Sequence, residues 1–357
     1  MQVPEFNIET VVTLDSEGRL LRPLPGALRE REQLIDLYQI MVLTRVFDRE
    51  AINLQRTGAM GTYPSCEGQE AIGAGIGVAM RKDDVFVPYY RDVTTQIQRG
   101  VLMEEILLYW GGDERGQKYR DQSQDFPVCI PIATQSCHAV GIAFAIKYRA
   151  EGRAVVTTCG DGATSEGDFY ESINVAGAMS LPVVFVVNNN RWAISVPLAK
   201  QTAAQTIAHK ALAVGITGIR VDGNDPIAVF EVLDEALERA RHDNQPTLIE
   251  ALTYRLGDHT TADDASRYHD QREYDEARTI EPLIRFKRLL QNEYQWSDAD
   301  DKALYDDSGE RVQQAIEVYQ ATSDQAPGEF FDYMFAKPTT DLVRQKKAWL
   351  DGLKHHG

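Results

Sequence analysis

The chain has 357 residues, of which 43% are hydrophobic and 25% charged, a composition that can bury a core without disulfides or metals to stabilise it. The formal net charge of −17 argues against binding to nucleic acid or to an anionic membrane surface. The N-terminus shows no signal-peptide pattern, no apolar run reaches about 18 residues, and the four cysteines form no C-x-x-C pair. We therefore expect one or two domains with reduced thiols, located in the cytoplasm.

The first 80 residues predict an extended arm followed by two helices. Residues 1–30 contain scattered prolines and charges and predict the arm. Apolar residues recur at helical spacing from Glu32 to Arg56, and Gly58 is placed to cap that helix. The glycine-rich piece 68–80 predicts a closely packed helix, because its spacing matches neither a Rossmann nor a Walker loop.

From residue 85 onward, short apolar runs alternate with segments of helical period. The predicted strands are Val85–Val87, Ala154–Cys159, Leu181–Val187, Ile219–Val221 and Thr247–Tyr254. The predicted helices are Phe169–Met179, Thr202–Val214 and the segment that Asp225 caps and that runs to about Arg241. This alternation predicts an α/β fold with a mostly parallel sheet and helices on both faces. We assign residues 31–280 to that domain and residues 281–357 to a charged helical segment packed on it.

The residues beyond the ends of these strands form a mixed set, in chain order Tyr90, Arg91, Asp161, Asn190 and His259. Ligands of open α/β sheets bind beyond the carboxyl ends of the strands. A carboxylate with neutral oxygens suits Mg²⁺, which is rarely enclosed by protein alone and takes phosphate oxygens as further ligands. The set therefore favours a cation that in turn holds a diphosphate, with the arginine on the other side.

Spacing supports this interpretation. Asp161 and Asn190 are 29 positions apart (190 minus 161), about one βαβ unit, so their strands are expected to be neighbours. The backbone N–H groups of Gly162 and Ala163, which open the next helix, would add to the anion site. Taken singly, each feature has a plainer interpretation, such as an ordinary turn, a surface arginine or a loop histidine. Their order and spacing together favour the metal–diphosphate site.

These residues lie in segments that resemble a known family. The stretch GDGATSEGDFYESINVAGAMSLPVVFVVNNNRWAIS (160–195) is similar to the alpha subunit of the thiamine-diphosphate-dependent, decarboxylating first component of 2-oxo acid dehydrogenase complexes. Further similar segments are LTRVFDREAINLQRTGAMGTYPSCEGQEA (43–71), YRDV (90–93), IATQ (132–135), VDGNDP (221–226) and LIEALTYRLGDHTTADDASRY (248–268). The resemblance covers nearly the whole chain and implies the thiamin-diphosphate-binding fold. It is greatest to the bacterial pyruvate type, and the branched-chain type is the alternative.

The resemblance also implies the cofactor ligands. Magnesium would be held by Asp161, Asn190 and the main-chain carbonyl of Trp192. Tyr90 and Arg91 match diphosphate-binding positions. A diphosphate contact at Asn188 stays open, because some relatives carry arginine there.

Two further positions match the reactive part of the family's site. Ile132 matches the residue whose main chain contacts the aminopyrimidine ring. His259 matches the histidine that lies near the diphosphate and substrate and assists acyl transfer to a lipoyl group, so it is the implied catalytic residue. Segment 257–270 matches a loop that orders when the cofactor binds. Within it, Thr260 lies where mammalian relatives carry a regulated serine, and we do not expect it to be phosphorylated here.

The implied activity is oxidative decarboxylation of pyruvate with transfer of the acetyl group to a lipoyl acyltransferase. In this family the beta subunit supplies the glutamate that activates the cofactor, and nothing marks Glu67 or Glu70 as that residue. We therefore expect activity only with a beta subunit, in an assembly of two alpha and two beta chains. The alternatives are a branched-chain 2-oxo acid or acetoin as substrate, and a silent cofactor-binding subunit. Phosphoryl transfer is disfavoured because the chain lacks the G-x-x-x-x-G-K-[ST] loop.

Overall fold

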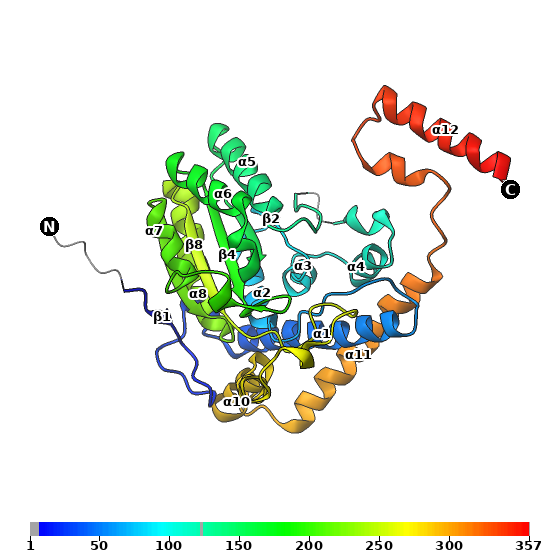
Figure 1. Ribbon diagram of the computed structural model, residues 1–357. Coiled ribbons are helices and arrows are strands. Elements are labelled where there is room, and N and C mark those ends of the chain that lie inside the picture. The colour runs from blue at the N-terminus through cyan, green and yellow to red at the C-terminus, as the bar shows by residue number, and fades with distance from the viewer. Residues whose placement is uncertain (1–6, 122–123, 357) are drawn as a thin grey trace.

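The computed structural model describes residues 7–121 and 124–356 and is built around a parallel β-sheet (Figure 1). Six strands pair in the order β1-β7-β8-β4-β3-β2, and every pairing is parallel. Their bounds are β1 Thr10–Val11, β2 Val85–Val87, β3 Val155–Gly160, β4 Val183–Asn189, β7 Thr217–Asp222 and β8 Thr247–Leu252. The predicted α/β architecture and all five predicted strands are confirmed.

Helices cover both faces of the sheet (Figure 1). The helices before β3 are α1 Arg31–Arg56, α2 Glu70–Ala79, α3 Val93–Gln98, α4 Met103–Trp110 and α5 Thr134–Tyr148. The later ones are α6 Gly167–Ala178, α7 Lys210–Ala213, α8 Pro226–Asp243, α9 Gln271–Thr279, α10 Pro282–Tyr294, α11 Asp298–Ala321 and α12 Thr340–His356. Gly58, with φ of +78°, follows α1, and the Asp225 carboxylate accepts hydrogen bonds from two backbone N–H groups of α8. Both predicted capping positions are therefore confirmed.

Alternation along the strands divides the core into two layers. On β4, Val184 and Val186 belong to the layer formed with α2 and α8. The intervening Val183, Phe185 and Val187 belong to the layer formed with α5 and α6. Successive side chains on a strand point to opposite faces, so a strand buried on both faces reads as a continuous apolar run. LPVVFVV shows that pattern in the sequence.

One predicted helix is wrong. Instead of a helix over Thr202–Val214, the structure has a 3-10 turn at Ile207–His209 followed by α7. The Thr206 side chain caps this short element by accepting from the His209 N–H. Lys210 contacts the segment after β3, where its Nζ donates to the Thr164 carbonyl at 2.7 Å. These side-chain and long-range contacts replace the first two helical turns that the apolar spacing predicted.

The two ends of the chain differ in whether they pack on the sheet. β1 lies at one edge of the sheet, and the Asp225 carboxylate accepts from the backbone N–H groups of Thr13 and Leu14 at 2.7 and 2.6 Å. In Figure 1, α12 lies apart from the sheet and its helical layers. The division at residues 30 and 280 stays a prediction, and residues 1–6 and 357 fall outside the described ranges. Among the residues described, no helix is both long and apolar enough to span a membrane.

Candidate active site

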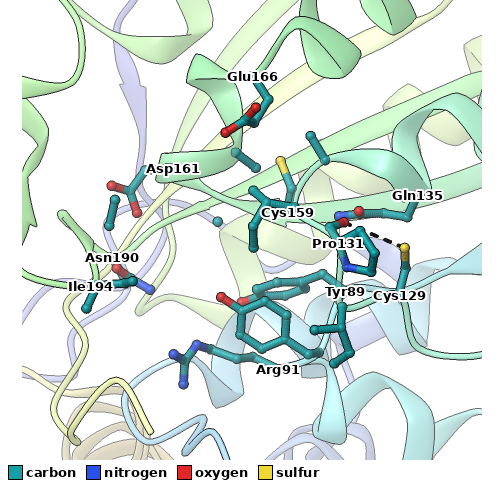
Figure 2. A pocket seen from close by; sticks show the side chains of 18 of the residues that line it. Tyr89, Arg91, Cys129, Pro131, Gln135, Cys159, Asp161, Glu166, Asn190 and Ile194 are labelled. Atoms are coloured by element: carbon teal, nitrogen blue, oxygen red, sulfur yellow. Dashed lines mark hydrogen bonds between the residues drawn. The ribbon is translucent and has the colours of Figure 1, made fainter. Parts of the chain in front are cut away.

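A cavity of about 220 Å³ lies beyond the carboxyl ends of β2, β3 and β4. All nine site residues predicted from the sequence line it, namely Tyr90, Arg91, Ile132, Asp161, Gly162, Ala163, Asn190, Trp192 and His259. Figure 2 shows Asp161, Asn190 and Arg91 on one side of the cavity and Cys129, Pro131 and Gln135 on the opposite side. The cavity therefore has a polar end and a largely apolar end, as an amphipathic ligand requires.

Asp161 occupies the polar end because β3 and β4 are neighbours. Gly160 on β3 is in register with Asn188 on β4, which brings Asp161 and Asn190 to adjacent strand ends. Asp161 then opens a short 3-10 helix, Asp161–Ser165, so Gly162 and Ala163 lie in its first turn. A Cβ atom at Gly162 would lie 2.7 Å from the Cβ of Ala193, so only glycine allows this close approach.

The Asp161 carboxylate is buried and only half satisfied. Its Oδ2 accepts from Gln201 Nε2 at 2.9 Å, whereas Oδ1 has no hydrogen-bond partner. Burial raises the pKa of this carboxyl to about 6, against hydrogen bonds and the nearby Arg255 charge that lower it. A buried carboxylate oxygen without a partner is costly, and a bound cation would satisfy it. Asp161 therefore fits the role of a metal ligand.

Asn190 and Trp192 lie in a strained hairpin next to Asp161. The hairpin pairs β5 (Trp192–Ala193) with β6 (Val196–Pro197), and the flanking Arg191 and Ile194 both have positive φ, +71° and +54°. The Asn190 side-chain oxygen accepts from the Trp192 N–H at 3.2 Å. The Trp192 carbonyl accepts one long hydrogen bond, 3.4 Å, from Arg255. Both oxygens keep a lone pair for a cation.

Arg91 and His259 are held together at the mouth of the polar end. Arg91 Nη2 lies 2.9 Å from His259 Nδ1 and donates to the His259 carbonyl at 2.6 Å, while Nη1 donates to the Ser65 carbonyl at 2.5 Å. The guanidinium also lies 5.2 Å from the centre of the Tyr90 ring, within cation–π range. Arg91 is therefore fixed by its neighbours before any anion arrives.

The contact with Arg91 determines the tautomer of His259. A guanidinium has no acceptor, so Nδ1 must accept the hydrogen bond and the proton must reside on Nε2. Burial and the charges of Arg91 and Arg255 lower the pKa of His259 to about 3. The imidazole is therefore neutral at ordinary pH and offers an N–H donor at Nε2.

The apolar end is formed by segment 129–133 and the start of α5. Ile130 and Ile132 remain about half exposed, at 45% and 47%. Ala133 adopts φ of +66° at the start of α5, an uncommon conformation for a residue with a Cβ. Gln135 donates to the Thr158 carbonyl at 2.8 Å, and its buried side-chain oxygen has no partner. Exposed apolar side chains at the mouth of a cavity are typical of a surface that another chain covers.

Several acidic or polar residues singled out in the sequence lie elsewhere. Asn188 does not line the cavity; it donates to the Tyr89 hydroxyl at 2.8 Å. Glu70 is buried in an ion pair with Arg45, whose Nε lies 2.5 Å from its Oε1, and Glu67 lies 3.6 Å from the same arginine. Neither glutamate lines the cavity. Neither is therefore placed to activate a ligand bound there.

Two supporting residues were missed in the sequence. Gln201 orients Asp161, and Arg255 donates to the main chain of the hairpin, to Ile194 at 2.9 Å and to Trp192 at 3.4 Å. Arg255 is fully buried, which is rare for arginine. Nothing in the local pattern of QT (201–202) or YRL (254–256) reveals these contacts, because both partners are distant in the chain.

Asp92, next to Arg91, supports a prediction about stability. Its carboxylate is buried and accepts from the Tyr89 N–H at 2.9 Å and from the Thr158 hydroxyl. Burial raises the pKa of Asp92 to about 8, so its contribution to stability is present below pH 4 and is lost as pH rises through 8. Relative to Asp92→Asn, the wild-type chain should lose about 4 kcal/mol of unfolding free energy between pH 5 and pH 8.

Urea unfolding of both chains at the two pH values measures this difference. Because every other titrating group is common to the two proteins, parallel pH dependences would contradict the prediction.

Comparison with known proteins agrees with this geometry. The profile of the family described as "Dehydrogenase E1 component" matches residues 38–328. The chain belongs to the dehydrogenase E1 component family. Family membership brings thiamine diphosphate dependence and a beta-subunit partner, and the chain is the alpha subunit of a 2-oxo acid dehydrogenase.

Relatives of this E1 chain have two kinds of names. It is 45% identical over 285 residues, 80% of its length and 76% of the relative's, to "3-methyl-2-oxobutanoate dehydrogenase subunit alpha" of Mycobacterium tuberculosis. It is 39% identical over 337 residues to "Pyruvate dehydrogenase E1 component subunit alpha" of Bacillus subtilis, covering 94% of this chain and 91% of that one. The protein of the same name from Staphylococcus aureus is 38% identical over 96% of this chain and 92% of its own.

Proposed function

We propose that this chain is the alpha subunit of a pyruvate dehydrogenase, and that the cavity holds the magnesium–diphosphate half of thiamine diphosphate. In this proposal Asp161, Asn190 and the Trp192 carbonyl hold Mg²⁺, and Tyr90 and Arg91 bind the diphosphate. The backbone N–H groups of Gly162 and Ala163 would add to the anion site, and the main chain of Ile132 would contact the aminopyrimidine ring. The observation that carries the proposal is the unpartnered, buried Asp161 Oδ1 at a shared end of β3 and β4.

The donor set supports magnesium over a softer metal. One carboxylate with two neutral oxygens leaves room for phosphate oxygens and water, the ligands Mg²⁺ retains. Zinc sites instead use several histidine, cysteine or carboxylate ligands. Among residues 7–121 and 124–356, no three such side chains converge.

The residues of this chain have distinct tasks in the proposed reaction. Thiamine diphosphate supplies the nucleophilic carbon and the electron sink that decarboxylation requires. Arg91 and the metal ligands would hold the diphosphate end and so restrict the orientation of the rest of the cofactor. His259 donates from Nε2 and positions the lipoyl group that accepts the acetyl group. The apolar end, with Ile130 and Ile132, limits the access of water once a partner covers it.

The cavity's size supports a site shared with the beta subunit. At about 220 Å³ it is smaller than the roughly 300–1,000 Å³ typical of complete small-molecule pockets. Glu67 and Glu70 lie outside the cavity, and Glu166, which does line it, directly follows the short 3-10 helix that Asp161 opens. We propose an assembly of two alpha and two beta chains that delivers acetyl groups to a lipoyl acyltransferase, with reduced cysteines in the cytoplasm.

The branched-chain substrate 3-methyl-2-oxobutanoate is the second candidate. The 45% identity to the Mycobacterium tuberculosis protein favours it, although that match covers less of the chain than the pyruvate-type matches. The difference between the two acids is two methyl groups, which a pocket distinguishes by only about 1–3 kcal/mol per methylene-sized group.

The test is calorimetric titration of thiamine diphosphate with and without Mg²⁺, using the chain alone and the complex co-expressed with its beta subunit. We expect tight, magnesium-dependent binding in the complex, and turnover of pyruvate in preference to 3-methyl-2-oxobutanoate. Binding to neither sample would refute the site. Preferential turnover of the branched acid would establish the second candidate.

A further inference from the structure

His269 lies at the centre of an aromatic cluster behind the metal-binding hairpin. Its ring centre is 4.8 Å from that of Trp192, 4.9 Å from Tyr268 and 5.4 Å from Tyr254. Tyr268 also packs on Trp192 at 5.3 Å. Burial lowers the pKa of His269 to about 4, so its ring is neutral and packs as an aromatic group. The cluster therefore joins two segments that are distant in the chain, the hairpin and the end of loop 257–270.

The hairpin needs such external support. Positive φ at Arg191 and Ile194 costs on the order of 1–3 kcal/mol per residue, and β5 and β6 pair over only two residues each. The Trp192 ring lies on the cluster while its carbonyl belongs to the proposed metal site. Packing of His269 against Trp192 therefore stabilises the conformation in which Asn190 and the Trp192 carbonyl converge with Asp161.

The same cluster reaches His259 through a short chain of hydrogen bonds. The Tyr268 hydroxyl donates to the Asp263 carboxylate and accepts from Arg255 at 2.6 Å. Asp263 in turn accepts from the His259 N–H at 2.8 Å. The position of residues 268 and 269 is therefore coupled, through Tyr268 and Asp263, to the backbone of His259.

The cluster also contains features that weaken the contact between loop 257–270 and the hairpin. The His269 Nε2 atom is buried without a hydrogen-bond partner, and Trp192 Nε1 and Tyr254 Oη have only a poorly aligned contact with each other. A buried polar group without a partner costs about 1–3 kcal/mol, which offsets part of the aromatic packing energy. The packing of loop 257–270 on the hairpin is therefore only modestly favoured. A ligand that binds better to the ordered hairpin would shift the equilibrium further toward the packed loop.

We propose that His269 is a positioning residue: by packing on Trp192 it fastens loop 257–270 to the metal-binding hairpin, so that ordering of the hairpin orders His259. This inference rests on the function proposed above and adds to it the physical link between the metal site and the loop.

Hydrogen–deuterium exchange of the alpha–beta complex tests the link directly, without and with thiamine diphosphate and Mg²⁺. In the absence of cofactor, His269→Ala should raise exchange at residues 259–268 at least tenfold over wild type, whereas His269→Phe should restore it to within about threefold. The calorimetric Kd for thiamine diphosphate should rise about 5- to 20-fold in His269→Ala and much less in His269→Phe. His242→Ala, on the exposed side of α8, is the matched control and should leave both quantities unchanged.

A second variant separates the two ends of the loop. Tyr268→Phe keeps the ring contacts with Trp192 and His269 but removes the hydroxyl that bonds Asp263 and Arg255. It should raise exchange near His259 and leave the 268–269 end protected. This variant also gives an answer if His269→Ala proves unstable.

The outcomes are distinguishable. Wild-type protection in His269→Ala, or equal loss in His269→Ala and His269→Phe, would overturn the role of aromatic packing. If the wild-type complex binds no thiamine diphosphate, the proposed function fails, whereas the cofactor-free exchange still decides whether His269 anchors the loop.

Discussion

Replacing Asp161 with asparagine should abolish magnesium-dependent binding of thiamine diphosphate while leaving the fold intact. The substitution keeps the shape of the side chain and its acceptor for Gln201, but it removes the only charged ligand among the three proposed metal ligands. Loss of an outer-shell partner of a metal ligand already costs about 10- to 100-fold in affinity, so loss of the charged ligand should cost at least about 100-fold. The measurement is calorimetric titration of the cofactor into the alpha–beta complex at several Mg²⁺ concentrations.

A graded control accompanies this experiment. Gln201→Ala removes the hydrogen bond to Asp161 Oδ2 without touching the proposed metal, and should weaken binding by about tenfold. The cofactor-free Asp161→Asn complex should unfold at a temperature no lower than wild type, because a buried carboxylate with one unpartnered oxygen is replaced by a neutral group. Wild-type cofactor affinity in Asp161→Asn would exclude Asp161 as the metal ligand.

Substitution of His259 should separate catalysis from cofactor binding. His259→Asn retains an acceptor where Nδ1 meets Arg91 but has no donor at the position of Nε2. Turnover with the lipoyl acceptor should fall by about 10²- to 10⁴-fold, the range typical of a lost acid–base group. The Kd for thiamine diphosphate should change less than about threefold, since Arg91 keeps its partners at the Ser65 and His259 carbonyls.

The comparison that decides this prediction is between two acceptors. Transfer to the lipoyl acyltransferase should be lost, while decarboxylation coupled to a small redox dye should be reduced less. Since burial and the charges of Arg91 and Arg255 lower the pKa of His259 to about 3 in the cofactor-free protein, a titration of its ring without cofactor should show no step near 6.5. Unchanged acyl transfer in His259→Asn would remove His259 from the reaction.

How much of the site was predictable follows from how its residues are connected. Asp161, Asn190, Arg91 and His259 each follow an apolar run that the sequence identifies as a strand. Parallel strands end at a common edge, so recognising the strands is enough to gather these side chains. The same reasoning identified the neighbouring strands of Asp161 and Asn190 before their register was known.

The features that the sequence did not predict depend on contacts between residues distant in the chain. The segment 202–214 has helical spacing, yet Lys210 and Thr206 make contacts that restrict the helix to four residues. Gln201 and Arg255 act on partners 40 and 61 to 63 positions away, at Asp161, Ile194 and Trp192. Local periodicity carries no signal for such contacts.

The sequence by itself therefore determined the parallel α/β sheet, the strand ends and the chemistry gathered beyond them, because alternation and apolar runs are properties of neighbouring residues. Only the tertiary structure decided the orphaned oxygen of Asp161, the tautomer of His259 and the aromatic cluster around His269. Each of these depends on distances between side chains from separate segments, and those distances exist only once the layers have packed.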